Sequence, residues 1–129
     1  MDKRDFKQRF ADGLKTRREV LGAEYVDKAM AGTDDFNAPF VDMLNTMCWN
    51  DVWNRPGLER KTRSMLNLAM LSALGRTHEL KLHINGALNN GLTKEEIREV
   101  FLQVAIYCGV PAAVESFRSA KEVFKERGV

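Results

Sequence analysis

Cysteine is scarce in this sequence, and its placement excludes several kinds of site. Cys48 and Cys108 lie far apart and belong to no CxxC or Cys/His metal-binding pattern. Neither a disulfide framework nor a metal site is therefore indicated. We expect a reducing compartment, in which each cysteine behaves as a small buried hydrophobic residue.

An excess of one charge and a long apolar run are also missing. The formal net charge is only +2 at pH 7, which favours neither a nucleic-acid footprint nor binding to a membrane surface. No stretch approaches the roughly 18 consecutive apolar residues of a spanning helix. The opening segment, MDKRDFKQRF, is charged throughout and lacks the apolar core of a signal peptide. We therefore expect a cytoplasmic protein with no nucleic-acid or membrane partner.

Alternating strand patterns are absent as well, whereas helical periodicity runs through the first half of the chain. The first helix should carry Phe6, Phe10, Leu14, Arg17 and Leu21 at helical spacing and end near Gly22. The later predictions for this half are a helix over 24–30 closed by Gly32 and a break over 53–58, WNRPGL. Between them, Thr33, Asp34 or Asp35 should cap a third helix with apolar residues at near-helical spacing: Phe36, Phe40, Val41, Leu44 and Met47.

The second half predicts further helices with clear ends. These are a helix over 59–74, a helix over 77–90 ended by Gly91, a helix opened by the capping box Thr93–Glu96, and a last helix with Pro111 in its first turn. Apolar residues cover almost the whole circumference of the 59–74 helix, so we expect it to be buried on most sides. The fold class is all-α.

Length and composition predict one domain that is covered in part by other copies. The chain has 129 residues, 44% of them hydrophobic, which suffices for a core. So many apolar faces on so short a chain indicate a homo-oligomer.

Three ionisable residues, Arg76, Glu79 and His83, share one side of the predicted 77–90 helix at its apolar border. A solvated helix border and a small active site both fit this spacing. Arg63, one turn before Asn67, favours the active site, because a guanidinium on a buried helix needs an anion partner. That partner is either Glu79 or another carboxylate of the protein, or a carboxylate of a ligand.

Aromatic residues near these positions have competing interpretations. Trp49 precedes the two helices and either packs in a core or interface or lines a pocket. Gln103 and Tyr107, one turn apart, either face a cavity or pack in the core, and we expect packing.

Three stretches together closely resemble the carboxymuconolactone decarboxylase family: RPGL at 55–58, ALGR…EL.LH…ALNNG.T.EEI at 73–97, and Q.AIYCGVPAA at 103–113. The similarity is strong over 55–124, and RREVLGAEYVDKA and DDFNAPF extend it into the N-terminal part. The resemblance implies an alkylhydroperoxidase D-like helical fold and a hexamer built as a trimer of dimers. It also implies one domain over 1–129, with N-terminal helices over about 1–54 and the family core over 55–126.

Within that resemblance, the activity to expect is cofactor-independent decarboxylation of 4-carboxymuconolactone, a small dicarboxylate lactone. The products would be 3-oxoadipate enol-lactone and CO2, in the protocatechuate (β-ketoadipate) route of aromatic degradation. The lactone ring accepts the electrons released by decarboxylation, so no metal or organic cofactor is expected. Peroxide reduction is not expected, because aligning His83 with the histidine of the redox relatives puts Arg76 and Glu79 at their CxxC cysteines.

The resemblance implies roles for five residues. Arg63 and Arg76 would anchor a carboxylate and stabilise the dienolate oxygen, with Trp49 as a further substrate contact. His83 would be the proton donor or oxyanion partner, with Glu79 setting its tautomer and basicity. The reverse division, with Glu79 as the acid, stays open. Two other functions also stay open: decarboxylation of a different small carboxylated lactone, and non-catalytic binding of a small anion by a helical oligomer.

Overall fold

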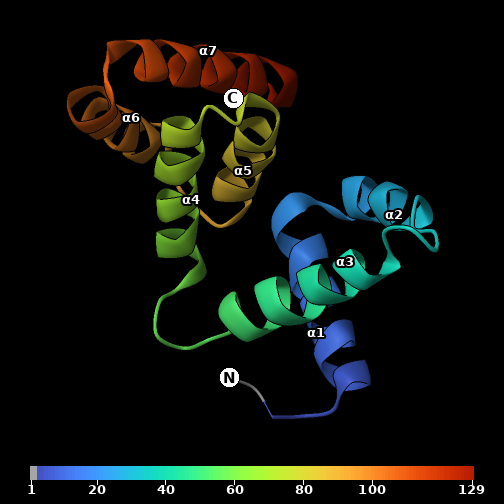
Figure 1. The fold of residues 1–129 in the computed structure, drawn as a ribbon. Helices are drawn as coiled ribbons and strands as arrows, with labels where there is room; N and C mark the ends of the chain where they lie inside the picture. The colour runs from blue at the N-terminus through green and yellow to red at the C-terminus, as the bar shows by residue number, and fades with distance from the viewer. Residues whose placement is uncertain (1–2) are drawn as a thin grey trace. The chain divides into compact units, whose positions relative to one another are not determined.

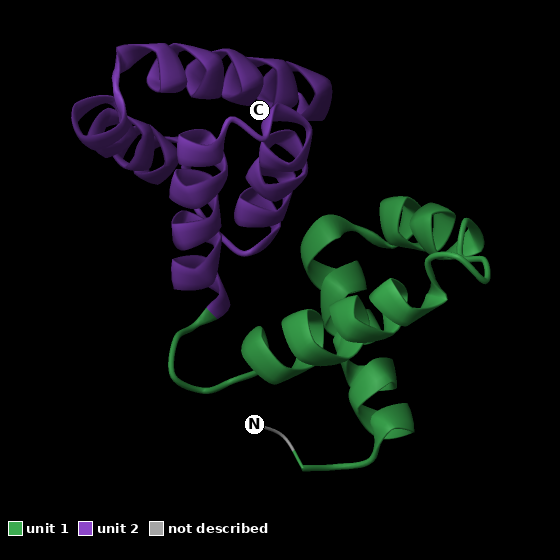
Figure 2. Ribbon diagram, viewed as in Figure 1, with its two compact units in different colours: residues 1–59 green, residues 60–129 purple. Residues whose placement is uncertain are grey.

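The computed structural model describes residues 3–129, and these form two compact units (Figure 1, Figure 2). Unit 1 ends at Glu59 and unit 2 begins at Arg60. Every regular element within 3–129 is a helix, which confirms the all-α prediction. None of the described helices is both long and apolar enough to cross a bilayer.

Unit 1 contains α1 (Phe6–Leu21), α2 (Ala23–Ala31), α3 (Ala38–Met43) and the π-helix η1 (Leu44–Val52). The first two helices match the prediction, and Gly22 ends α1 at a φ of 98°, which glycine adopts without strain. The predicted cap of the third helix was wrong. The Asp34 carboxylate instead accepts hydrogen bonds from the backbone N–H groups of Phe36 and Asn37. This side chain closes a turn before α3, and Asn37 is the N-cap residue.

The change from α3 to η1 occurs without a break in the ribbon (Figure 1). η1 crosses α1 at Gly13, where an added Cβ would lie 1.7 Å from the carbonyl oxygen of Asn45. Such close approach of two backbones requires glycine. Periodicity alone does not distinguish a π-helix from an α-helix over so short a segment, so the sequence predicted an ordinary helix here.

The core of unit 1 combines a small apolar cluster with a polar network. Val20, Trp49 and Trp53 are buried together, and the two indole rings stack with centroids 4.9 Å apart. In the polar network, the buried Asp51 carboxylate accepts hydrogen bonds from both Nε and Nη2 of Arg9. This bidentate pair satisfies a charge that would otherwise be costly to bury.

Unit 2 contains α4 (Arg60–Leu74), α5 (Thr77–Asn89), α6 (Lys94–Cys108) and α7 (Val110–Arg127). The predicted end signals are confirmed. Gly91 has a φ of 93° after α5, and Pro111 lies in the first turn of α7. Thr93 and Glu96 form the capping box, with 3.0 Å for each of its two hydrogen bonds.

The four helices of unit 2 enclose one apolar core. Its buried members are Leu68, Leu80, Ile84, Ala87, Leu92, Ile97, Phe101, Ala120 and Val123. Phe101 meets Phe117 edge-on, with ring centroids 5.6 Å apart. Small residues let α4 and α7 approach closely, and the Ser116 hydroxyl donates to the Ser72 hydroxyl at 2.7 Å.

Several apolar side chains of unit 2 remain on its surface, contrary to three predictions. α4 is not buried on most sides, because Leu66, Met70 and Leu74 are exposed. α6 leaves Tyr107 79% exposed, so the expectation that Gln103 and Tyr107 pack in the core was wrong. Cys108 is also exposed and Cys48 only partly buried, so the prediction of two buried cysteines fails for Cys108.

Candidate active site

The candidate residues of unit 2 are positioned by the antiparallel hairpin of α4 and α5. The Asn90 amide at the end of α5 donates to the Ser64 hydroxyl of α4 at 2.9 Å and sets the register of the two helices. The Arg76 N–H donates to the Leu71 carbonyl at 3.0 Å and closes the end of α4. The first half of α4 therefore lies opposite the second half of α5. This register places the Arg63 side of α4 near the His83 side of α5.

The hairpin brings Asn67 to His83. Nδ2 of the Asn67 amide lies 3.4 Å from Nδ1 of the imidazole. An amide NH2 group can only donate, so Nδ1 accepts and the proton of the neutral ring resides on Nε2. Asn67 thus favours the tautomer that carries its proton on Nε2.

Burial determines the charge of His83. Desolvation lowers the pKa of the imidazole from its ordinary value to about 4, and the carboxylate of Glu79 opposes this shift only in part. The ring is therefore neutral near pH 7. A neutral imidazole is a hydrogen-bond donor suited to an oxyanion, and it is a far weaker acid than an imidazolium.

Glu79 and Arg63 lie on either side of this pair. Glu79 is exposed and precedes His83 by one helical turn on α5. Arg63 is partly buried on α4, and its Nε is enclosed by protein. Four residues separate it from Asn67, a rise of about 6 Å along the helix. An extended arginine side chain is long enough to span this rise from Arg63 to the level of Asn67.

Arg76 lies apart from the Asn67–His83 pair. It is the N-cap residue of α5, with φ −89° and ψ 72°, and precedes His83 by about 10 Å of helix rise. Its side chain lines a pocket of about 370 Å³ between the end of α4 and the start of α7, together with Glu115 and Ser116. Neither Glu79 nor His83 lines this pocket. The structure brings together Arg63, Asn67, Glu79 and His83 on one hairpin but gives Arg76 a different environment.

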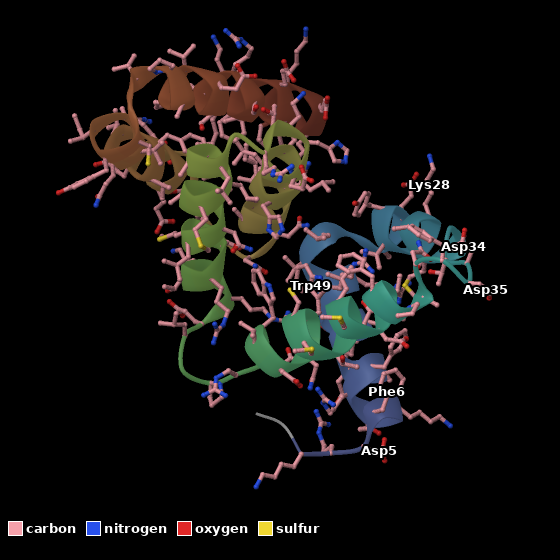
Figure 3. All side chains as sticks on the ribbon, in the orientation of Figure 1. Asp5, Phe6, Lys28, Asp34, Asp35 and Trp49 are labelled. Atoms are coloured by element: carbon pink, nitrogen blue, oxygen red, sulfur yellow. The ribbon has the colours of Figure 1, made fainter. Side chains whose placement is uncertain are left out.

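Trp49 belongs to unit 1, where it projects from η1 (Figure 3). It is 3% exposed and stacked on Trp53. Its expected packing role is confirmed, whereas its role as a substrate contact stays a prediction.

A second pocket of unit 2, of about 540 Å³, is mostly apolar. Its lining comes from α4 and α6: Thr62, Met65, Leu66, Ala69, Val100, Gln103, Val104, Tyr107 and Cys108. No carboxylate, histidine, lysine or arginine lines it. Among residues 3–129, no group of three or more His, Cys, Asp and Glu side chains is placed to hold a metal ion.

Asn67 is the site residue that the sequence did not identify as functional. The available signal was its position one turn after Arg63 on the same side of α4. What was missing was the register between α4 and α5, which depends on tertiary packing.

Comparison with known proteins places this hairpin in a family. The model of the carboxymuconolactone decarboxylase family matches residues 38–122. A 4-carboxymuconolactone decarboxylase of Acinetobacter baylyi is 43% identical over 122 residues, covering 95% of this chain and 91% of the relative. A nitrosuccinic acid decarboxylase of Metarhizium robertsii is 44% identical over 107 residues, covering 83% and 75% respectively. The chain therefore belongs to the carboxymuconolactone decarboxylase family.

Proposed function

We propose that this protein is a carboxy-lyase that decarboxylates a small dicarboxylate without a cofactor, and that its substrate is 4-carboxymuconolactone. The observation that carries the proposal is the neutral His83, whose Nδ1 meets Asn67 on the α4–α5 hairpin. The relative from Acinetobacter baylyi, which is named for this activity, supports the choice of substrate.

The substrate can supply its own electron sink. Cleavage of the bond between the ring carbon and its carboxylate releases CO2, and the electron pair moves through the ring C=C bond onto the lactone carbonyl oxygen. The resulting dienolate is then protonated at carbon, which gives 3-oxoadipate enol-lactone. The protein must hold the second carboxylate, stabilise the new oxyanion and deliver one proton.

We assign these tasks to the residues of the hairpin. His83 Nε2–H donates a hydrogen bond to the developing oxyanion. In a desolvated site this hydrogen bond becomes stronger as negative charge builds up on the oxygen. Arg63 anchors a carboxylate through its planar guanidinium, whereas a second anchor at Arg76, which lines a different pocket, stays a prediction. Glu79, exposed and one turn away, then delivers the proton or relays it from water. This is the reverse division of roles that the sequence left open.

Nitrosuccinic acid is the second candidate substrate, because a relative of similar identity is named for it. Both compounds carry a carboxylate and a CH2–carboxylate group on the carbon that loses CO2. In nitrosuccinate the nitro group, rather than the lactone, accepts the electron pair. One hairpin with carboxylate anchors and an oxyanion donor fits both reactions.

The test is decarboxylation of each compound without added metal, followed by NMR, in wild type and His83→Ala. His78, the other histidine of the chain, is exposed on the same helix, so His78→Ala is the matched control. We expect turnover of 4-carboxymuconolactone by wild type and by His78→Ala, and a loss of about 100-fold or more in His83→Ala. Turnover of nitrosuccinate alone would select the second substrate, and turnover of neither compound would overturn the proposal.

We further propose that the active form is a homo-oligomer, with the trimer-of-dimers hexamer as its expected arrangement. The support is the exposed apolar surface of α4, α6 and the start of α7, of which the most exposed members are Leu74, Ile106, Tyr107 and Val110. Contiguous apolar surface of this kind is typical of interfaces between copies.

A further inference from the structure

Arg17 on α1 is a buried arginine without a carboxylate partner. It is 7% exposed, and its Nη1 donates to the Asn45 amide oxygen at 3.3 Å and to the thioether sulfur of Met30 at 3.7 Å. Both acceptors are neutral, and a thioether is a weak one. Within residues 3–59 no Asp or Glu forms a salt bridge with it.

The other two arginines of α1 each have the carboxylate partner that Arg17 lacks. Arg9 donates hydrogen bonds from Nε and Nη2 to the Asp51 carboxylate. Arg18 donates from the same two atoms to the Asp27 carboxylate, at 2.9 Å from Nε and 3.1 Å from Nη2. This edge of the guanidinium is the one that matches a carboxylate. In Arg17 the corresponding Nε is enclosed by protein and has no hydrogen-bond partner.

The protein groups around Arg17 do not supply a negative charge. The titratable groups that interact with it are Tyr25 and Cys48, a phenol and a thiol. Burial raises the pKa of the Cys48 thiol, and the nearby guanidinium only partly opposes that shift, so the thiol remains protonated near neutral pH. An arginine stays charged in a protein, and its burial calls for an anion.

Thr33, which follows α2, offers a second enclosed donor. The Thr33 hydroxyl is buried without a hydrogen-bond partner, and the Thr33 N–H bonds to the carbonyl of Met30 at 3.0 Å. Met30 therefore connects the two unsatisfied groups, since its sulfur contacts Arg17 and its backbone contacts Thr33. Its flexible side chain is only partly buried and is suited to move aside.

We propose that unit 1 contains a binding site for a small carboxylate, in which the Nε edge of Arg17 holds the anion, Thr33 donates a further hydrogen bond and Met30 covers the entrance. The carboxylate would form with Arg17 the bidentate pair that Arg9 and Arg18 form with protein aspartates. This proposal does not rest on the proposed decarboxylase activity.

The test uses acetate and succinate as probes, titrated against chloride at constant pH and ionic strength. The readouts are the Tm and the fluorescence of Trp49 and Trp53, which are the two tryptophans of the chain and lie beside Cys48 in the core of unit 1. Binding to the folded state alone should raise the Tm by about 5 to 10 °C when the probe is at about 100 times Kd. The fluorescence should change with the same Kd.

Three variants separate this site from general salt effects. Arg17→Met should lose both responses, and it should be at least as stable as wild type without a probe because a buried unpaired charge has gone. Thr33→Val should bind at least about fivefold more weakly, as expected for one lost hydrogen bond. Arg18→Met removes the same charge one residue away and should respond like wild type.

Two results would overturn the proposal. One is a wild-type protein whose Tm and fluorescence do not respond to either probe, which decides the question even if Arg17→Met fails to fold. The other is a response of the same size and Kd in Arg17→Met as in wild type, because the probe would then bind at a site that does not use Arg17.

Discussion

Asn67 and His83 meet across the α4–α5 hairpin, with the amide Nδ2 3.4 Å from the imidazole Nδ1. The amide thereby fixes which ring nitrogen carries the proton. We propose that Asn67 acts through the histidine that it contacts, as a positioning residue. Its loss should alter the reaction through His83.

Asn67→Leu should lower kcat by about 10- to 100-fold with little change in KM, the range for losing a group that orients a functional histidine. Steady-state kinetics on the dicarboxylate that the wild type turns over measures both constants. The control is Asn85→Leu, which removes an amide of α5 that donates to the Lys81 carbonyl. Equal kcat values for wild type and Asn67→Leu would remove Asn67 from this role.

The pH dependence of kcat should report a neutral His83. Because burial lowers the pKa of this imidazole to about 4, we expect no change in kcat from His83 between about pH 5 and 8. A proton-donating imidazolium would instead give a kcat that falls as the pH rises through its pKa. An inflection of that kind, present in wild type and absent in His83→Gln, would contradict the role as a neutral donor.

Stability should depend on pH through the same residue. In the unfolded chain the imidazole titrates near pH 6.5, whereas in the folded chain it stays neutral down to about pH 4. The unfolded state therefore binds more protons between these values. The free energy of unfolding keeps its full value above pH 6.5 and decreases as the pH falls towards 4. Urea unfolding should show a smaller decrease for His83→Gln than for wild type or His78→Gln.

Gly13→Ala should lower the free energy of unfolding by about 3 kcal/mol, because the new methyl group would collide with the backbone of Asn45. Alanine otherwise stabilises a helix interior by about 1 kcal/mol relative to glycine. Gly57→Ala is the matched control, since a Cβ there has no atom within 4 Å. Urea titration of both variants should give a loss for Gly13→Ala alone. A stabilised Gly13→Ala would mean that α1 and η1 do not cross so closely.

Ile106→Glu should reduce the size of the oligomer without unfolding the chain. Ile106 is 81% exposed, so a charged side chain costs the isolated fold little, whereas it would be buried in an interface between copies. Light scattering after size exclusion measures the mass, and circular dichroism checks the helix content. Lys125→Glu, exposed near the end of α7, should keep the wild-type mass. An unchanged mass in Ile106→Glu would place the interface elsewhere.

The helix ends were predictable from sequence because their signals are local. Gly22, Gly91 and the Thr93–Glu96 box each act within one or two turns of chain. The π-helical turn of η1 was not predictable, because it accompanies a backbone contact at Gly13 with a segment more than thirty residues away. The exposure of Tyr107 was likewise not predicted, because a hydrophobic pattern identifies an apolar face but not the surface that covers it.

The candidate site was predictable in part for the same reason. Spacing placed Glu79 and His83 on one side of a helix, and it placed Arg17 among apolar residues, where it is buried. Spacing did not reveal that Asn67 faces His83 or that Arg76 lines a different pocket. Nor did it reveal that Arg17 is surrounded by neutral acceptors. Each of these depends on the register between elements.

The π-helical winding of η1 makes the length of this segment as important as its composition. A π-helix accommodates an extra residue in its wider turn, so deleting one residue from 44–52 would let the segment relax to an α-helix. Each residue of an α-helix advances the chain by about 100° around the axis, so a further insertion that the turn does not absorb would point Trp53 away from Val20. Residues 44–52 should therefore accept substitutions at their exposed positions, and even the loss of one residue, far more readily than a further insertion.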